Sequence, residues 1–266
     1  MKHVTSRHNE RLREVERLIA SSRDRRKSGR CVLEGAHLID VYCAKIGEPE
    51  TLVVVADRLE EADIARLIRR VPAARTIAVS RTLFSEIATL PPDVGALAVV
   101  ATPHAPAAEP GHFCLLLEDV QDPGNVGSMI RTAAAAGIDQ VVLSRHCAFA
   151  WSPKVLRAGQ GAHFLTTLVE DRDLVQWTSA FRGAGGRLVA TVVGNATAVD
   201  AADLRGRVAI AIGSEGGGLS EALVAAADQR ITIPMASGSE SLNAAAAAAV
   251  VLFEGVRQRR DRSARR

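Results

Sequence analysis

Short apolar runs alternate with stretches of helical periodicity along most of this 266-residue chain. Five of these runs lie in its second part, and each leads into a polar or glycine-containing segment; they begin at residues 113, 140, 187, 207 and 230. Nearly continuous apolar strands joined by helical crossovers are typical of a parallel sheet covered on both faces. The alternation therefore predicts an α/β fold, in which ligands gather at the carboxyl ends of the strands.

A proline-rich segment, ATPHAPAAEPG at residues 101–111, divides this pattern into two parts. We expect a linker there, because prolines and small residues interrupt the apolar periodicity. Before it, apolar runs alternate with helical stretches in the same way, and residues 5–30 have the pattern of one basic amphipathic helix. The sequence thus predicts a smaller α/β domain over residues 1–105 and a larger one over residues 112–266.

Basic residues are concentrated at the two ends of the chain. Residues 1–30 hold ten Lys and Arg against four Asp and Glu, and residues 256–266 hold six Arg against one Asp. Because the whole chain has a formal charge of only +3, the body between these ends is acidic. Basic arms favour a polyanionic partner through counterion release from phosphates, although two solubilising tails would have the same composition.

Composition and spacing argue against several other classes of protein. No uncharged apolar stretch is long enough to span a bilayer, and no signal peptide is visible, so we expect a cytoplasmic protein. The four cysteines and seven histidines lack metal-ligand spacing, which predicts no metal site. The loop GNVG lacks the G-x-G-x-x-G and G-K-[ST] spacings, which argues against a nicotinamide-dependent oxidoreductase and against an ATP site.

Three loops at predicted strand ends carry most of the polar residues that packing does not explain. They are EDVQDPGNVGSMIR (118–131), GSEGGGLS (213–220) and IPMASGSESLN (233–243). Each has an ordinary explanation when taken alone: a turn with Asn125 as a helix cap, a solvated glycine turn around Glu215, and a helix cap at Ser241. Glycine also permits positive φ and close approach of the backbone to a ligand.

The order and spacing of the three loops resemble one known family. DPGNVGSMIRTAAAAG resembles the Asn-x-x-Gly-x-x-x-Arg motif of the SpoU (TrmH-type) RNA ribose 2′-O-methyltransferases, which belong to the SPOUT class. AIGSEGGGLS is similar to their Gly-x-Glu-x-x-Gly-Leu motif, and IPMASGSESLNAAAAA to their third motif, from Ile-Pro-Met to Ser-Leu-Asn. Residues 112–256 carry this resemblance. Two departures, Ala136 with Gly137 and the alanines after Asn243, fall at packing positions.

The leading part is similar, over SRHNERLREVERLIASSRDRRKSGRCVLEGAHLID, to the substrate-binding region fused to many of these enzymes, which resembles ribosomal protein L30e. The family resemblance implies a trefoil knot in the C-terminal parallel-sheet domain, S-adenosylmethionine as cofactor, RNA as partner and a homodimer as the working form. Gly213, Ile233 and Leu242, helped by Met235, would bind the cofactor largely through backbone groups.

The same resemblance implies roles for five polar residues. Arg131 would be the central catalytic residue, and we expect it to polarise and orient the ribose 2′-hydroxyl, because a guanidinium keeps its proton. Asn125 and Asn243 would fix Arg131 and the ribose through hydrogen bonds. Ser241 would hold its loop or a phosphate. Glu215 would orient Arg131 or anchor its own glycine loop.

The expected substrate is 23S ribosomal RNA, because family members that act on transfer RNA often lack a large leading domain. Two alternatives stay open at this point. One is the same reaction on transfer RNA. The other is an inactive RNA-binding factor in ribosome assembly, against which the retained polar loop residues count.

Overall fold

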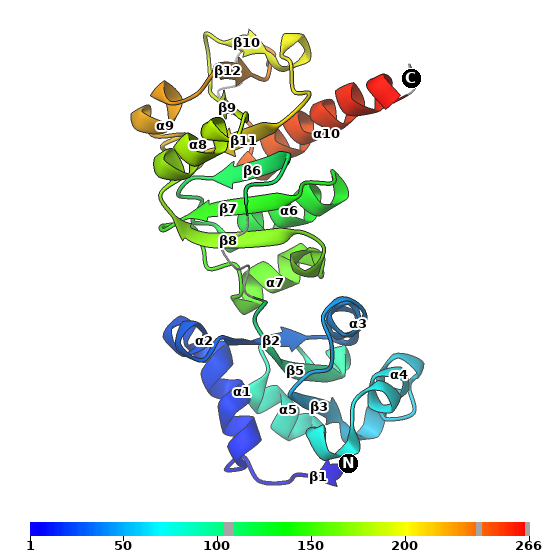
Figure 1. Ribbon diagram of the computed structural model, residues 1–266. Helices are drawn as coiled ribbons and strands as arrows, with labels where there is room; N and C mark the ends of the chain where they lie inside the picture. The colour runs from blue at the N-terminus through cyan, green and yellow to red at the C-terminus, as the bar shows by residue number, and fades with distance from the viewer. Residues whose placement is uncertain (104–108, 238–240, 264–266) are drawn as a thin grey trace. The chain divides into compact units, whose positions relative to one another are not determined.

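The computed structural model describes residues 1–103, 109–237 and 241–263, with side chains up to residue 260. The chain divides into two compact units, each built on its own sheet (Figure 1). One unit comprises Met1–His104 and Trp151–Phe164, and the other comprises Ala105–Ala150 and Leu165–Arg266. The expected end of the first domain, residue 105, lies outside the described residues. The segment Trp151–Phe164 groups with the first unit, whereas the sequence division places it in the second domain.

The first unit is built on a five-stranded mixed sheet with the order β1-β4-β3-β5-β2. Its strands are β1 (Lys2–His3), β2 (Arg30–Glu34), β3 (Thr51–Val55), β4 (Thr76–Val79) and β5 (Ala96–Ala101). Its helices are α1 (Glu10–Ala20), α2 (Ser22–Ser28), α3 (Ala36–Lys45), α4 (Ala62–Arg70), α5 (Arg81–Ile87) and α7 (Pro153–Gly159), with 3-10 turns at Ala56–Arg58, Ala73–Arg75, Pro92–Val94 and Ala162–Phe164. β5 runs antiparallel to β3 and β2, while the β1-β4-β3 part is parallel.

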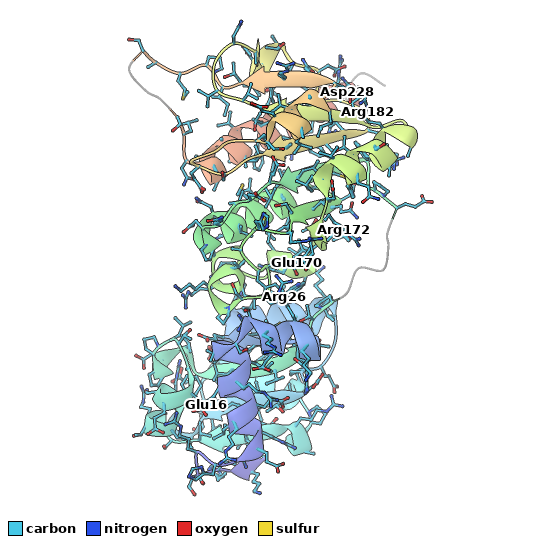
Figure 2. The ribbon with its side chains drawn as sticks, turned by 90° about the vertical axis from the view of Figure 1, so that its left-hand side faces the viewer. Glu16, Arg26, Glu170, Arg172, Arg182 and Asp228 are labelled. Atoms are coloured by element: carbon cyan, nitrogen blue, oxygen red, sulfur yellow. The ribbon has the colours of Figure 1, made fainter. Side chains whose placement is uncertain are left out.

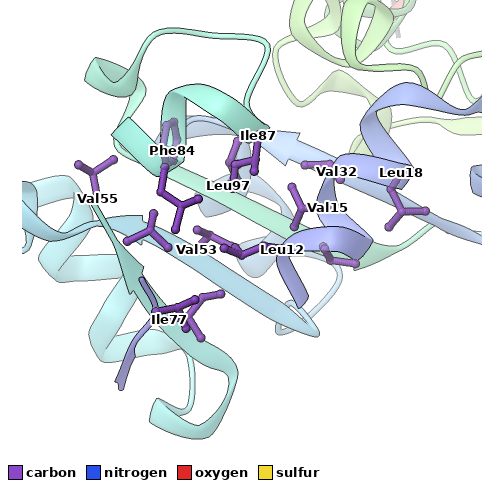
Figure 3. Packing of buried hydrophobic residues seen from close by; sticks show 14 residues of the cluster. Leu12, Val15, Leu18, Val32, Val53, Val55, Ile77, Phe84, Ile87 and Leu97 are labelled. Atoms are coloured by element: carbon purple, nitrogen blue, oxygen red, sulfur yellow. The ribbon is translucent and has the colours of Figure 1, made fainter. Parts of the chain in front are cut away.

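The core of this unit explains why the leading segment is helical. Leu12, Val15 and Leu18 follow one another at helical spacing on α1, and all three are buried. They share one apolar cluster with Val53 of β3 and Phe84 of α5 (Figure 3). Since a helix buries one stripe of its surface, this spacing fixes which face of α1 meets the sheet and leaves the arginines outside.

The basic leading segment forms two helices, which corrects the expectation of a single one over residues 5–30. α1 ends at Ala20, and Ser21 is in the extended conformation. The Ser21 hydroxyl accepts a hydrogen bond from the Asp24 N–H (3.1 Å) and so caps α2. Arg25 then points back toward α1, where its guanidinium donates to the Ile19 carbonyl oxygen (2.9 Å). The break is therefore built by a serine that stops one helix and starts the next.

The second unit is built on a seven-stranded parallel sheet with the order β10-β12-β9-β11-β6-β7-β8, which confirms the predicted parallel α/β fold. The strands are β6 (Phe113–Leu117), β7 (Gln140–Ser144), β8 (Thr167–Arg172), β9 (Arg187–Thr191), β10 (Thr197–Ala198), β11 (Val208–Ile212) and β12 (Gln229–Thr232). The helices are α6 (Pro123–Ala135), α8 (Leu174–Gly183), α9 (Glu221–Ala225) and α10 (Ala244–Ser263), with a 3-10 turn at Val199–Ala201.

Helices cover both faces of this sheet. On one face, Phe181 of α8 and Leu223 of α9 belong to an apolar cluster with side chains of the strands. Arg182 of α8 forms an ion pair (2.8 Å) with Asp228, just before β12, which ties the two segments together (Figure 2). On the other side α10 packs along α6 and contacts β11. Within the described part of the chain, no helix combines the length and the apolar character needed to cross a membrane.

The strand order reverses in the middle of the sheet. From β6 the chain continues to β7 and β8 on one side, and the later strands β9, β11 and β12 lie on the other side. β6 and β11 are direct neighbours, with Leu117 opposite Ile212 at their carboxyl ends. Ligands of open parallel sheets bind outside the carboxyl ends at such a switch point. The fold therefore directs attention to the loops after β6, β11 and β12. The trefoil knot stays a prediction.

Candidate active site

The three loops singled out in the sequence follow strands at the switch point and to one side of it. The first follows β6, the second follows β11, and the third connects β12 to α10. In the first loop the helix cap is Asp122, whose side chain accepts a hydrogen bond from the Asn125 N–H (2.7 Å), so Asn125 is not the cap. Pro123 is the first residue of α6, a position where its missing N–H costs nothing. The side chain of Asn125 therefore takes no part in capping α6 and can form other hydrogen bonds.

Asn125 joins the three loops through its side-chain amide. Its Nδ2 donates a hydrogen bond to Glu215 Oε1 in the second loop. Its Oδ1 accepts a hydrogen bond from Asn243 Nδ2 at the end of the third loop (3.0 Å). Asn243 also caps α10, because its Oδ1 accepts from the N–H groups of Ala245 (2.9 Å) and Ala246 (3.2 Å). The cap of this helix is therefore Asn243, where the sequence suggested Ser241.

A pocket of about 420 Å³ lies beside this junction. All four residues expected to bind a cofactor line it, and so do Glu215 and Ser241; the four are Gly213, Ile233, Met235 and Leu242. Apolar side chains such as Ile212, Leu219 and Val251 complete much of the wall. Among the described residues that line the pocket, Glu215 is the only charged one. The pocket is thus suited to a neutral flat group between apolar walls, with one carboxylate placed to meet a positive charge.

Backbone segments lie very close together in the glycine-rich loop that forms one side of the pocket. A Cβ atom at residue 213 would lie 2.1 Å from the carbonyl carbon and 2.2 Å from the carbonyl oxygen of Gly218. The loop is closed by mutual backbone hydrogen bonds between Ser214 and Gly218 (3.2 and 2.9 Å), and Gly218 has a positive φ of 63°. Gly213 is therefore required by space, and Gly218 by backbone conformation.

Family models match both parts of the chain. The model of the SpoU rRNA methylase family matches residues 112–253, and that of the MRM3-like substrate binding domain matches residues 9–98. The chain belongs to the SpoU rRNA methylase family. The three loops just described all lie in the matched range. The predicted family, and with it the class of methyltransferase, is confirmed.

Characterised relatives of this SpoU-family chain extend over nearly its whole length. The 23S rRNA (guanosine(2553)-2′-O)-methyltransferase RlmP of Bacillus subtilis is 30% identical over 95% of this chain and 98% of its own. The 23S rRNA (uridine(2479)-2′-O)-methyltransferase of Streptomyces viridochromogenes is 30% identical over 96% of this chain and 92% of its own. The crystal structure of the SpoU methyltransferase AviRb from Streptomyces viridochromogenes, in complex with AdoMet, superposes with a TM-score of 0.84 at 30% identity, over 94% and 98% of the two chains.

Arg131 of this SpoU methylase is not part of the hydrogen-bonded junction. It is exposed on α6, and it is not among the residues that line the pocket. Its side chain forms no hydrogen bond or ion pair with another of the described residues, so the expected contacts with Asn125, Asn243 and Glu215 are not made here. Its guanidinium, which has five N–H donors, is therefore available to a ligand.

The sequence reasoning missed two parts of the site. Thr191, Val192 and Val193, at the carboxyl end of β9, line the pocket. The rule that ligands gather at strand ends applies equally to β9, so this loop was detectable, but it has few polar residues. The second missed part is Glu118, the residue directly after β6, whose carboxylate accepts two hydrogen bonds from Ser220.

Cys147, whose thiol contacts the end of β6, is a further residue that could carry chemistry beside the first loop. Burial raises the pKa of the Cys147 thiol, which donates a hydrogen bond to the Leu117 carbonyl oxygen (3.2 Å) at the end of β6. A thiol held neutral in this way packs the loop and is a poor nucleophile. No group of three or more His, Cys, Asp or Glu side chains that could hold a metal ion occurs in the described ranges.

Proposed function

We propose that this SpoU methylase transfers a methyl group from S-adenosylmethionine to a ribose 2′-hydroxyl of 23S ribosomal RNA. The observation that carries the proposal is the meeting of three loops, distant in sequence, through Asn125, Glu215 and Asn243 beside one pocket. The two relatives named above act on 23S rRNA, and the similar solved structure holds AdoMet. We assign 23S rRNA as the substrate because both of those relatives are 23S rRNA methyltransferases.

The residues of the pocket fit the proposed cofactor. A volume of about 420 Å³ lies within the range of about 300–1,000 Å³ typical of small-molecule sites. Apolar walls suit an adenine ring, and the Glu215 carboxylate suits the positive charges of the sulfonium and amino groups. Because only glycine fits at position 213, the backbones of residues 213 and 218 can lie against each other and close one wall of the pocket. When bound, S-adenosylmethionine supplies an electrophilic methyl group.

The pocket residues bind and orient the cofactor. We assign the adenine and methionine parts to backbone groups of Gly213, Ile233 and Leu242, with Met235 as an apolar neighbour. Ser241 contributes a hydroxyl at the same wall. Glu215 is itself held by Asn125, so its carboxylate faces the pocket in a fixed position. Fixed positions matter because methyl transfer depends on the alignment of donor and acceptor.

We assign to Arg131 the role of contacting the substrate hydroxyl. A guanidinium keeps its proton, so Arg131 polarises and orients the ribose oxygen while the hydroxyl proton passes to solvent water. The exposure of Arg131 and its lack of a partner among the described residues support this assignment, since a group already paired would have to be released first. The hydrogen-bonded residues Asn125, Glu215 and Asn243 then hold the loops around the cofactor pocket.

The first unit would bind the RNA through the basic surface of α1 and α2. Arg13 and Arg17 of α1 and Arg23 and Lys27 of α2 are exposed. Neutralising phosphates with such side chains releases counterions and makes affinity depend on salt. The match to a substrate-binding domain over residues 9–98 supports this placement.

We also assign a homodimer and a cytoplasmic location to the chain. Two large apolar side chains of α10 are exposed, Val250 at 43% and Phe253 at 47%. Burying them against a second copy would remove apolar surface from water, and the alanine-rich start of the helix would allow close approach. A location beside ribosomes follows from the proposed substrate. Sedimentation of the purified chain tests the dimer.

A direct experiment separates this function from its alternatives. The purified chain is incubated with methyl-labelled S-adenosylmethionine and with 23S rRNA or transfer RNA, and the methylated ribose is mapped by mass spectrometry. We expect label in 23S rRNA at one 2′-oxygen. Label in transfer RNA alone would overturn the substrate. Failure to bind S-adenosylmethionine in calorimetry would overturn the enzymatic function and leave an RNA-binding role.

A further inference from the structure

Glu118 connects the first loop to the end of the glycine-rich loop. It is the first residue after β6, and its carboxylate accepts hydrogen bonds from both the backbone N–H and the hydroxyl of Ser220 (2.7 Å each). These two residues are 102 positions apart in the chain. Hydrogen bonds to an ionised carboxylate are shorter and stronger than neutral ones, and two of them fix direction as well as distance.

The loop that Glu118 holds is a wall of the pocket. All seven residues from 213 to 219 line it, and Ser220 follows immediately. Four of the seven are glycines, which have more conformations to lose than any other residue when they are ordered. At its start the loop continues from β11, a central strand. At its far end the Glu118 carboxylate is the contact from outside that holds Ser220 in place.

The direction of Glu118 is itself set by the next residue. Asp119 has a φ of 53°, in the left-handed region that residues other than glycine seldom adopt. The Ser144 hydroxyl holds it there by donating to Asp119 Oδ1 (2.6 Å) and accepting from the Asp119 N–H (2.9 Å). Strained residues persist only where their surroundings over-determine them, and they cluster at functional sites. Here the bend turns the chain between the Glu118 contact and the start of α6.

We propose that Glu118 is a positioning residue for the cofactor pocket, which it shapes by holding Ser220 and with it the wall formed by residues 213–219. The proposal rests on the assignment of S-adenosylmethionine to this pocket. Glu118 does not line the pocket, so it acts through the loop and makes no contact with the ligand. Loosening the wall raises the concentration of cofactor needed for binding, while the methyl transfer of the bound complex continues.

The contact is more than the capping of a helix. The Ser220 hydroxyl already caps α9 by accepting a hydrogen bond from the Leu223 N–H (3.2 Å), and this bond does not need Glu118. The neighbouring Glu221 provides a comparison. It is an exposed carboxylate one residue further on, and it makes no hydrogen bond or ion pair with the described residues. Removing its charge changes the local electrostatics without touching the connection.

The test compares Glu118→Gln and Ser220→Ala with the control Glu221→Gln in the full-length chain. Gln keeps the size of Glu, but it loses the charge and one acceptor oxygen. We expect Glu118→Gln to raise the Kd for S-adenosylmethionine five- to twentyfold in calorimetry, and Ser220→Ala to raise it three- to tenfold. The double variant binds no worse than Glu118→Gln, because both changes act on the same connection. Glu221→Gln stays within twofold of the wild type.

Kinetics distinguish positioning from general damage. We expect KM for S-adenosylmethionine to rise with Kd, while kcat at saturating cofactor and KM for RNA stay within twofold of the wild type. A merely structural role would lower the melting temperature and the active fraction, and so kcat, without moving KM. Ser220→Thr keeps the hydroxyl and should bind as the wild type does.

The outcomes separate the inference from the function on which it rests. If the wild-type chain does not bind S-adenosylmethionine, the proposed function is wrong, and the inference that rests on it is wrong too. If the wild type binds and both Glu118→Gln and Ser220→Ala bind within twofold, only the positioning role is overturned. An equal loss in Glu221→Gln would overturn it too, since charge alone would then explain the effect. Should Glu118→Gln prove unstable, Ser220→Ala decides.

Discussion

A single methyl group added at Gly213 should displace the wall of the cofactor pocket. In Gly213→Ala the new Cβ would lie 2.1 Å from the carbonyl carbon of Gly218, whereas ordinary contact begins at 3.4 Å. The two backbone segments must therefore separate by about 1.3 Å, the difference between these distances. The neighbours are backbone atoms, so no side chain can rotate away. Overpacking of this kind costs about 1–3 kcal/mol of stability, and cofactor binding must in addition return the displaced wall to its place.

Calorimetry with S-adenosylmethionine, together with thermal unfolding, measures both effects. We expect the Kd to rise about 5- to 150-fold, which is the overpacking cost of about 1–3 kcal/mol converted to affinity. The matched control is Gly216→Ala, three residues further along the same wall, where an added Cβ has no neighbour within 4 Å and φ is not in the left-handed region. This control should bind within about threefold of the wild type, since nothing must move. Equal affinity in the two variants would refute the reasoning from backbone contact.

Four further predictions test other parts of the site and the fold. Arg131→Ala should lower kcat at least about 100-fold, as the loss of a charge-stabilising donor does, with the Kd for S-adenosylmethionine unchanged; turnover within a few-fold of the wild type would contradict the assigned role. Asn125→Asp should lower kcat/KM more than Asn125→Ala, because it sets a second carboxylate against Glu215. Replacing Arg13, Arg17, Arg23 and Lys27, which are exposed on α1 and α2, by glutamine should reduce the salt slope of RNA binding by about three, measured by filter binding; an unchanged slope would place the RNA elsewhere. Burial raises the pKa of Cys114 to about 12, so this thiol should resist iodoacetamide at pH 8 in the folded chain and react after unfolding, as peptide mass spectrometry would show.

The sequence was sufficient for five strands of the second unit and for the three polar loops of the site that follow β6, β11 and β12. Apolar runs at residues 113, 140, 187, 207 and 230 correspond to β6, β7, β9, β11 and β12. Such strands are buried on both faces, so their composition is nearly continuous and easily recognised. The strands β8 and β10 were not predicted. β8 has three charged residues among six, and β10 has two residues, so neither has a strong apolar signal.

The contacts between loops could not be predicted from the residues alone. That Asn125 meets Glu215 and Asn243 depends on β6 and β11 being neighbours and on α10 starting beside them. Sequence spacing contains no information on strand order, and the family resemblance implied only that these residues share a site.

The break between α1 and α2 at Ser21 could not be predicted for another reason. The apolar spacing of α1 and the polar run of α2 together imitate one long amphipathic helix, and only the serine cap marks the boundary.

The chemistry of an amide explains why the residue at the junction is an asparagine. Position 125 must donate to the Glu215 carboxylate and accept from the Asn243 side chain at the same time. A carboxylate only accepts, and a serine hydroxyl has one donor and a shorter reach, whereas an asparagine amide presents a donor and an acceptor at two ends of one planar group. Asn125 uses one of its two N–H donors and one of its two acceptor sites in this way, and neither contact involves Arg131. The observed contacts therefore join Asn125 to the two loops of the pocket, and our proposal leaves the Arg131 guanidinium for the RNA.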